Sequence, residues 1–296
     1  MSGVPHPHAN DITVQFHHST AEIFVPDRRP LKSALTRITH LGIGAHQDDL
    51  EFMAFHGIAT CHGQQRKWFG GVTCTNGSGS ARTGRFKDYT DDQMMSVRRR
   101  EQNRAATLGQ YGVMIQLDHR SSDLKQPAFQ ALQSDLVQIL TATRPEVVYT
   151  HNLADKHSTH IAVVIAALQA LRELPRSQRP KQVIGCEVWR ALDWLPDTEK
   201  VVMDVTGHDR LGNQLNRVFA SQIAGGKRYD RATTGRRAAN ATFFQSHATD
   251  HASQVIFGHD LTPLIQDDTL NIRTFIAAAI DRFAQEVAGN LKRQGA

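Results

Sequence analysis

Three short segments of the sequence carry groups able to do acid–base or metal chemistry, each where a buried strand is expected to end. AHQDDLE at 45–51 holds one imidazole and two adjacent carboxylates, and TCTNGSGSARTG at 73–84 is a glycine-rich loop. THNLADKHSTH at 150–160 holds a carboxylate and two closely spaced histidines, Asp155, His157 and His160. Ligands bind beyond the carboxyl ends of strands in open parallel sheets, so these segments are the first candidates for a site.

The first and third segments together predict a metal site. His46 and Asp49 are three residues apart at a turn that enters a helix, so their side chains can converge, and His160 offers a third ligand from another strand end. Two histidines and one carboxylate with an open position are a common catalytic zinc set, in which a bound water has a pKa of about 7. Another divalent metal is an alternative. Asp48 stands beside this set as an uncommitted carboxylate, which suits a general base.

Each motif alone has a simpler interpretation. A single HxxDD segment is more typical of a capped helix start, in which an aspartate accepts hydrogen bonds from exposed N–H groups. HxxH alone is equally unspecific. The hypothesis of a site therefore depends on finding both motifs at consecutive strand ends of one sheet.

The surrounding elements alternate between strands and helices. Apolar runs rich in β-branched residues predict strands at 38–46, 68–75, 113–118, 147–152, 183–189 and 200–205. Apolar stripes at helical spacing predict helices at 93–108, 128–143, 161–171, 208–224, 235–250 and 270–288. This order predicts an α/β fold with a parallel sheet and helices on both faces. Residues 1–37 are expected to form an N-terminal arm with short strands at 12–16 and 21–26, and residues 38–296 one domain with a C-terminal α/β extension.

Composition excludes several classes of protein. The 296 residues are 40% hydrophobic and 21% charged, which does not fit a disordered or fibrous chain. Three cysteines without CxxC spacing predict neither a disulfide framework nor a cysteine zinc knuckle, so we expect a reducing compartment. The sequence shows no signal-peptide core and no membrane span, and we therefore expect a cytoplasmic protein.

Charge and glycine patterns exclude further partners. The formal net charge is +5, but the basic residues are scattered apart from RRR at 98–100, so we expect no nucleic-acid partner. GSGSARTG lacks the GK[ST] of a phosphate-binding loop, and GIGAHQ lacks the third glycine of a dinucleotide fingerprint. We therefore expect neither ATP nor NAD.

Four segments resemble motifs of the LmbE/PIG-L-like family of zinc-dependent de-N-acetylases, in family order over residues 38–254. GAHQDDLEFM resembles the AHPDDxE signature, and HNLADKHSTH resembles the later D-x-H-x-D-H element. RRREQNRAATLG at 98–109 is similar to an RxxE helix that ends in Leu-Gly, and HASQ at 251–254 to an HxSQ or HxTQ segment. The resemblance implies a Rossmann-like, LmbE-like α/β fold. It also implies hydrolysis of an N-acetylated amino sugar, such as an N-acetylglucosamine conjugate, to acetate and a free amine.

The resemblance also implies roles for single residues. His46, Asp49 and His160 would hold zinc, Asp48 would be the general base, and His157 would stabilise the oxyanion or donate a proton, as an imidazolium. The candidate substrate-binding residues are Arg82, Arg85, Arg98, Asp155 and His251.

Three departures from the family pattern stand out. Gln47 replaces the usual proline, for which we expect only a change in turn rigidity. Thr159 stands where an aspartate is common. Two roles for Asp155 stay open: it replaces that carboxylate as support for His157, or it only caps the loop. Ser78 occupies a loop position that is often acidic in the family.

Two other functions stay open at this point. The chain can be a non-catalytic homologue that binds a sugar or a polyanion, which the missing carboxylate at Thr159 favours, or an amidase that acts on a different amide. Retention of all the expected ligands and the base favours the enzyme. The expected partner is a small N-acetylated sugar whose identity the sequence does not specify, and a homo-oligomer also stays open.

Overall fold

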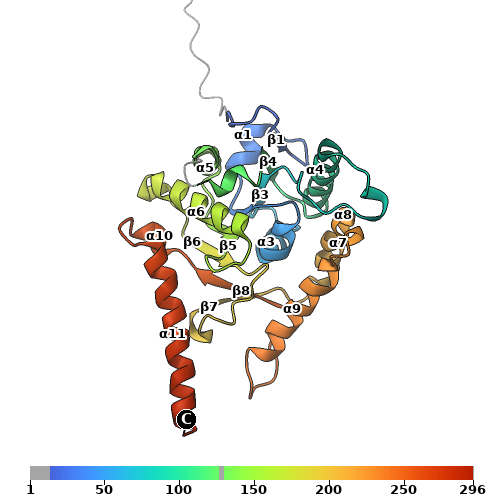
Figure 1. Ribbon diagram of the computed structural model, residues 1–296. Coiled ribbons are helices and arrows are strands. Elements are labelled where there is room, and N and C mark those ends of the chain that lie inside the picture. Colours follow the sequence, from blue (N-terminus) through green and yellow to red (C-terminus); the bar gives the residue numbers. More distant parts are fainter. Residues whose placement is uncertain (1–13, 127–129, 296) are drawn as a thin grey trace, which may run out of the picture.

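A mixed sheet of eight strands forms the centre of the molecule. The computed structural model describes residues 14–126 and 130–295 (Figure 1). Within these residues the strand order is β1-β4-β3-β2-β5-β6-β8-β7. The strands are β1 (Glu22–Phe24), β2 (His40–Gly44), β3 (Phe69–Thr75), β4 (Val113–His119), β5 (Val147–His151), β6 (Gln182–Cys186), β7 (Lys200–Asp204) and β8 (Val255–Asp260).

The middle of the sheet is parallel and its two ends are not. Strands β4, β3, β2, β5 and β6 pair in parallel, as the alternation of strands and helices predicts. β1 pairs antiparallel with β4, and β8 pairs antiparallel with both β6 and β7. The α/β fold is therefore confirmed, with the correction that the sheet is mixed. β1 lies within the predicted arm, whose boundary at residue 37 stays a prediction.

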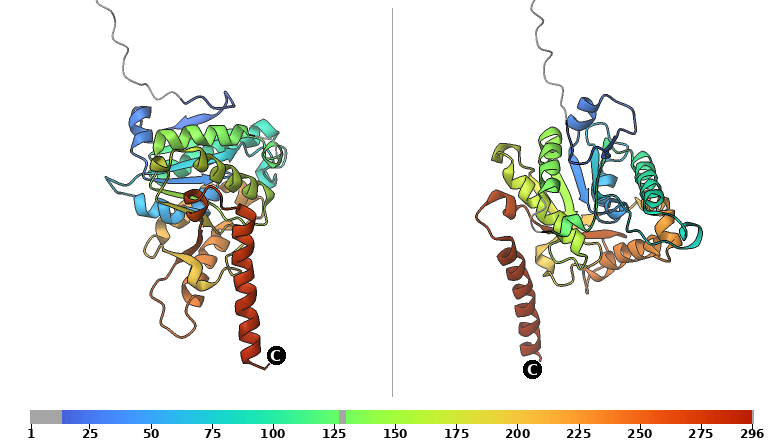
Figure 2. Two further views of the ribbon diagram at one scale, coloured as in Figure 1. Left: turned by 90° about the vertical axis from the view of Figure 1, so that its left-hand side faces the viewer. Right: turned by 45° about the horizontal axis from the view of Figure 1, so that its top comes forward.

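Helices cover both faces of the sheet (Figures 1 and 2). The α-helices are α1 (Leu31–Thr36), α2 (Asp49–Met53), α3 (Phe55–Cys61), α4 (Asp91–Leu108), α5 (Ala131–Thr143), α6 (Ser158–Glu173), α7 (Asp209–Val218), α8 (Ala220–Ala224), α9 (Tyr229–Phe243), α10 (Pro263–Gln266) and α11 (Ile272–Arg293). Short 3-10 helices are η1 (Gly84–Phe86), η2 (Asp123–Lys125), η3 (Arg176–Gln178) and η4 (Asp197–Glu199). Apolar residues of α1, α5 and α6 pack on one face, and those of α2, α3, α4 and α7 pack on the other.

A glycine in β2 lets α2 pack closely on the sheet. A Cβ atom added at Gly42 would lie 2.7 Å from the Phe69 ring and 2.9 Å from the Leu50 side chain. Such distances are steric clashes, so a larger residue would push α2 away from the sheet. The glycine therefore helps to hold the N-terminus of α2, where Asp49 stands, against the end of β2.

Most predicted elements are present, with shifted ends. The expected helix at 208–224 is two helices, α7 and α8, and the one expected at 235–250 is α9, which starts and ends earlier. β8 was not predicted, and residues 14–16 form no strand, whereas 12–13 lie outside the described residues. Helix α11 projects from the body of the molecule in Figures 1 and 2. No helix in the described ranges has the length and apolar character needed to cross a membrane.

Candidate active site

The sheet topology brings the first and third sequence segments together. From β2 the chain continues on one side of the sheet, with β3 next to β2 and β4 next to β3. It then crosses to the other side of β2, where β5 and β6 lie. The strand order thus reverses between β2 and β5, and the crevice at the carboxyl ends of such strands is where open α/β sheets bind ligands. His46 follows β2, and His157 and His160 follow β5. The strand-end argument therefore places both motifs at one crevice.

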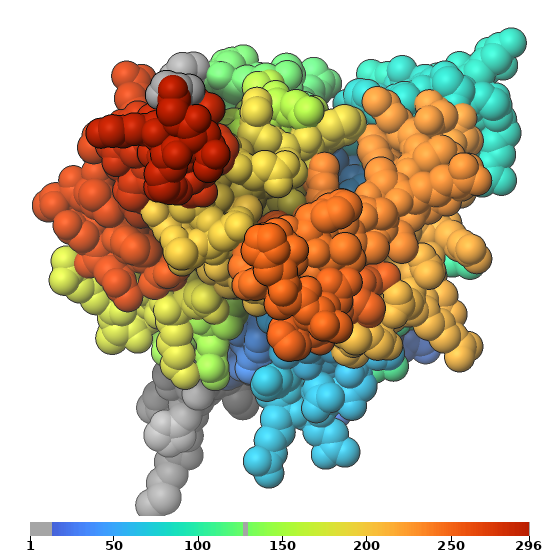
Figure 3. Space-filling model, turned by 90° about the horizontal axis from the view of Figure 1, so that it is seen from below, coloured from blue at the N-terminus to red at the C-terminus, as the bar shows by residue number. Residues whose placement is uncertain are grey.

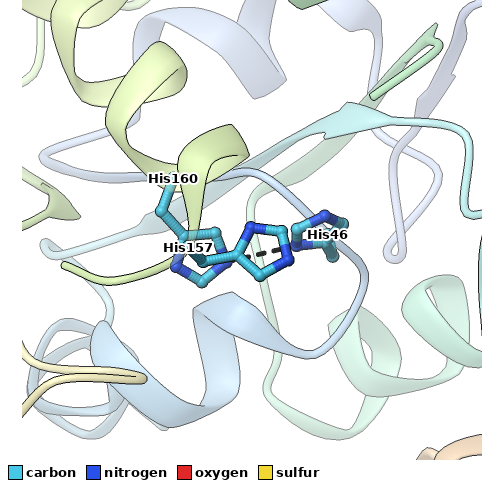
Figure 4. Close-up of side chains that lie close together, drawn as sticks. All are labelled: His46, His157 and His160. Atoms are coloured by element: carbon cyan, nitrogen blue, oxygen red, sulfur yellow. Dashed lines mark hydrogen bonds between the residues drawn. The ribbon is translucent and has the colours of Figure 1, made fainter. Parts of the chain in front are cut away.

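Three of the predicted site residues converge on one point. The Nε2 atom of His160 lies 3.2 Å from the Nδ1 atom of His46. The Asp49 Oδ2 atom lies 3.2 Å from His46 Nδ1 and 3.4 Å from His160 Nε2. A tetrahedral zinc with bonds of about 2.0–2.1 Å separates its ligand atoms by about 3.3 Å, so these donors fit one zinc ion. Figure 4 shows the rings of His46 and His160 facing each other.

Their electrostatics also suit a cation. Burial alone would raise the pKa of Asp49, but the neighbouring imidazoles of His160, His151 and His46 outweigh it and hold this pKa well below its usual range. An ionised carboxylate directed at two imidazole nitrogens is the donor chemistry of a zinc site. His160 is held from behind, because its Nδ1 atom lies 3.5 Å from Asp155 Oδ2.

His151 is a histidine of this cluster that sequence reasoning missed. Its Nε2 atom lies 3.5 Å from Asp49 Oδ2, and its ring stacks on that of His160 with 3.8 Å between centroids. The same Nε2 atom accepts a hydrogen bond from the Ala45 N–H at 2.9 Å. Because this lone pair is already used, His151 supports the site rather than ligating a metal. Its place as the last residue of β5 was the available signal, since the strand-end rule applies to it as well.

His157 lies at the open side of the same cluster. Its ring is 4.6 Å from that of His160 and 4.9 Å from that of His46, between centroids (Figure 4). Its nitrogen atoms also belong to a second group of mutually close donors, with those of His46 and His160. Burial, followed by the nearby His160 and His46, lowers the pKa of His157 to about 4. This shift favours the neutral form of the ring near pH 7.

Asp48, next to Asp49 in the chain, is held by Arg98. The backbone of Asp48 has a φ of 98°, in the left-handed region that residues other than glycine rarely adopt. Its carboxylate accepts a hydrogen bond from Arg98 Nη2 at 3.0 Å, and its N–H donates to Gln102 Oε1 at 3.2 Å. Burial raises the pKa of Asp48, and the Arg98 guanidinium opposes that rise. The left-handed turn and this ion pair fix a second carboxylate beside the cluster.

Arg98 is the centre of a buried network rather than a free substrate contact. It also donates to the Gln47 carbonyl, to Glu101 Oε2 at 3.1 Å and to Ser221 Oγ at 3.3 Å. Glu101 in turn accepts the N–H of Ser221 at 2.8 Å. The guanidinium lines the pocket, but the residue is only 2% exposed and most of its donors are engaged. The arginine and glutamate of the RxxE segment, Arg98 and Glu101, thus form a buried link between α4, α8 and the turn that holds Gln47 and Asp48.

Two of the departures from the family pattern have structural consequences. The Gln47 side-chain amide donates to the Thr75 carbonyl at 2.9 Å, so this residue ties the turn to β3 rather than only changing its rigidity. Asp155 accepts the backbone N–H of His157 at 2.9 Å and faces the ring of His160, not that of His157. The carboxylate thus positions the loop and a predicted metal ligand, because the peptide N–H of His157 occupies its other oxygen. Thr159 is buried and lines the pocket.

A pocket of about 610 Å³ opens onto these residues. Its floor includes His46, Asp48 and Asp49, and its walls include Phe52, Trp189, Lys227, Tyr229 and Arg236. Figure 3 shows a hollow at this end of the molecule, between yellow and orange parts of the chain, with blue atoms at its floor. The wall residues from 189 onward were not predicted, although Trp189 closes the segment 183–189 that was predicted as a strand.

Three predicted substrate-binding residues do not line this pocket. Arg82 donates to the Ser78 carbonyl at 3.0 Å and pairs with Asp91. Arg85 lies over the ring of Phe86, in a different surface depression. His251 is exposed in the segment before β8 and is not part of the pocket lining. The arginines of the glycine-rich loop are held by the contacts just described, and the HASQ segment lies against α7, where Gln254 bonds to Asp209. A role for these three residues in substrate binding stays a prediction.

Comparisons with known proteins agree with the motifs. Residues 41–171 match the family model described as PIG-L, GlcNAc-PI de-N-acetylase. A search of curated protein sequences gave no match. Among solved structures, N,N'-diacetylchitobiose deacetylase from Pyrococcus horikoshii is 16% identical with a TM-score of 0.61, over 80% of this chain and 88% of that one.

Two further structures show how widely the fold is used. GalB, the 4-carboxy-2-hydroxymuconate hydratase from Pseudomonas putida KT2440, is 19% identical with a TM-score of 0.58, over 75% of this chain and 96% of that one. The zinc-inhibited form of the teicoplanin deacetylase Orf2 is 15% identical with a TM-score of 0.53, over 75% and 97% of the two chains. A fold shared by deacetylases and a hydratase does not specify the reaction. Residues 41–171, with their HxxDD and HxxH motifs, thus belong to the PIG-L/LmbE de-N-acetylase family.

Proposed function

We propose that this protein is a zinc-dependent hydrolase that removes the acetyl group from an N-acetylated amino sugar of the N-acetylglucosamine type. The observation that carries the proposal is the separation of two functions at the crevice. His46, Asp49 and His160 have donor atoms at mutual distances of 3.2, 3.4 and 3.2 Å, whereas the Asp48 carboxylate is held separately by Arg98. A hydrolytic metal site needs both a ligand set and an uncommitted base.

The three donors would hold zinc or another divalent metal. When bound there, zinc supplies polarisation of the acyl carbonyl and acidification of a water. One related structure is described in a zinc-inhibited form, so the native metal is best determined by measurement.

The remaining roles belong to this chain's own groups. Asp48 takes a proton from the attacking water and delivers it to the departing amine, so that one acetamide and one water give acetate and a free amino sugar. His157 donates a ring N–H to the oxyanion of the tetrahedral intermediate, since its ring borders the cluster on the pocket side. Asp155 positions the loop that carries both His157 and His160.

The pocket supports a sugar rather than a very small amide. A volume of about 610 Å³ with aromatic walls is large enough to enclose a mono- or disaccharide. Because the fold is shared with a hydratase, the reaction itself needs a direct test.

Acetate release from a panel of acetylated sugars tests the proposal. We expect the purified wild-type protein to release acetate and a primary amine in equal amounts from N-acetylglucosamine, N-acetylgalactosamine, a chito-oligosaccharide or a nucleotide-linked form. The Asp48→Asn variant should hold the same metal and lose this activity. Fully metal-loaded protein that releases no acetate from any member of the panel would contradict the proposal and favour a sugar-binding homologue or another amide.

A further inference from the structure

The outer wall of the pocket comes from a part of the chain that the family model does not cover. Trp189, Lys227, Tyr229 and Arg236 all line the pocket, and all lie beyond residue 171, where the match ends. The orange and yellow segments that border the hollow in Figure 3 belong to this part of the chain. What this wall recognises must therefore be read from its own side chains.

An aromatic corner adjoins the proposed catalytic residues. The rings of Trp189 and Tyr229 are perpendicular with 6.0 Å between centroids, and Phe52 lies 5.3 Å from Tyr229. The Trp189 indole is nearly parallel to the His157 ring at 6.3 Å, and its backbone N–H donates to Asp155 Oδ2 at 3.2 Å. Asp155 thus fixes the indole beside the cluster, where its flat face can pack on the apolar face of a sugar ring.

Two cationic side chains stand at this corner. The Lys227 Nζ atom lies 5.2 Å from the centre of the Trp189 ring, and Arg236 donates to the carbonyl of Val188, the residue before Trp189. Within residues 14–126 and 130–295, neither has a carboxylate oxygen within 4.0 Å. Both are therefore close to the same indole and available to a ligand.

Most other charged groups of the lining are already committed, although Lys125 of η2 also lines the pocket. Arg98 is bound to Asp48 and Glu101, and Arg237 donates to the carbonyls of Glu51 and Phe52. The nearest acidic group, Glu187, accepts the N–H of Phe257 at 3.1 Å and a bond from Asn240, and burial raises its pKa. The nearby Arg236 opposes that rise but forms no ion pair with Glu187, so in the part of the chain that the structure describes Lys227 and Arg236 are both left without a salt-bridge partner.

We propose that the amino sugar bound here carries an anionic substituent, a sulfate, a phosphate or a carboxylate, which Lys227 and Arg236 recognise while Trp189 packs against the ring. The inference rests on the proposed function and specifies its substrate class. A neutral acetylated sugar would fill the corner but leave both cations without a partner. The difference between charged and neutral substrates should therefore appear mainly in KM, because Lys227 and Arg236 would contact the substituent of the sugar and not its acetamide.

The test compares one neutral probe with three charged ones. The probes are N-acetylglucosamine, its 6-sulfate, its 6-phosphate, and a disaccharide of N-acetylglucosamine and glucuronate. We expect kcat/KM of the wild-type protein to be at least about 10-fold higher for one charged probe than for the neutral one, since a net hydrogen bond to a charged group changes affinity by about 10- to 100-fold. The preferred charged probe identifies the anion.

Variants attribute that preference to the corner. Lys227→Gln and Arg236→Gln should each raise KM for the preferred charged probe by about 10-fold, with kcat and the neutral probe changed less than about twofold. Lys292→Gln, which removes an exposed lysine near the end of α11, is the matched control and should change neither. Added salt should raise KM for the charged probe only.

The outcomes separate this inference from the proposed function. The inference would be overturned if kcat/KM is equal for charged and neutral probes, or if Lys227→Gln and Arg236→Gln lower it equally for both. Release of acetate would still support the hydrolase in either case. If no probe is hydrolysed, calorimetric binding to the Asp48→Asn protein decides. Tighter binding of a charged probe that depends on Lys227 upholds the anion site without the hydrolase, and equal or undetectable binding of all probes overturns it.

Discussion

Replacement of Arg98 by methionine should damage stability and catalysis together. Arg98 is 2% exposed and donates to the carboxylates of Asp48 and Glu101, which would both lose their cation in Arg98→Met. Removing one partner from a buried ion pair costs about 3–5 kcal/mol. Glu101 keeps two bonds from Ser221, at 2.8 and 2.7 Å, so we expect the low end of that range. For a chain of this size that is a fall in Tm of roughly 5–10 °C.

The effect on turnover has a separate cause. Without the guanidinium, Asp48 loses the group that orients its carboxylate and that opposes the rise of its pKa by burial. A misplaced and partly protonated base should lower kcat/KM by roughly 100-fold or more, within the usual contribution of general-base catalysis. Metal content should stay at the wild-type level, since Arg98 contacts none of the three proposed ligands.

Two further variants separate the causes. Glu101→Gln keeps the Arg98–Asp48 pair, so its activity should stay within a few fold of wild type. The double variant Arg98→Met with Glu101→Gln removes one of the orphaned carboxylates, so it should regain part of the lost Tm without regaining activity. The measurements are thermal unfolding, metal analysis and acetate release on all four proteins. Wild-type kcat/KM in folded Arg98→Met would refute the assignment of Arg98 as the residue that positions the base.

The remaining predictions concern the base, its neighbour and acid stability. Asp48→Asn should lower kcat by roughly two to four orders of magnitude with metal content unchanged, by acetate release and metal analysis; activity within a few fold would exclude Asp48 as the base. His157→Gln should lower kcat more than it raises KM, whereas an equal loss through KM alone would assign it to binding. Burial lowers the pKa of His259 to about 4. In the unfolded chain this histidine binds a proton near pH 6.5, whereas in the folded chain it stays neutral down to about pH 4. The free energy of unfolding therefore falls as the pH falls through that window. His259 alone accounts for a loss of about 3 kcal/mol in the free energy of unfolding across that window. In His259→Gln, the free energy of unfolding measured with urea should therefore fall less steeply between pH 7 and 4.5 than in the wild type. An equally steep fall in both proteins would contradict this prediction.

The parallel core, and the close approach of the three proposed ligands, could be predicted because local patterns determine them. A buried strand such as 38–46 can be recognised as an apolar run in the sequence. The residues that follow it lie at the carboxyl end of a parallel strand, which is the edge of the sheet where ligands bind. That rule led to His46, Asp49 and His160, and applied to the last residue of each strand it would also have led to His151. β8 was missed because its pairing with β6 and β7 depends on contacts between distant segments.

The pocket wall could not be predicted for the same reason. Trp189 and Arg236 are 47 residues apart in the sequence and line one pocket only because the segment after β6 lies beside α9. Arg82 had the right type and the right strand end, yet its loop turns it toward Asp91, a direction that no spacing encodes. Sequence patterns thus identify the catalytic floor, which follows strand ends, more readily than the specificity wall, which depends on loop direction.

Metal stoichiometry in two single variants tests the central claim most directly. His46, Asp49 and His160 form one close set of donors, but His46, His157 and His160 form another, and the two differ in whether Asp49 or His157 completes the site. Inductively coupled plasma mass spectrometry on zinc-loaded and desalted protein should find about one zinc per chain in the wild type and in His157→Ala, and little in Asp49→Ala. Full zinc in Asp49→Ala with loss in His157→Ala would contradict the proposed ligand set.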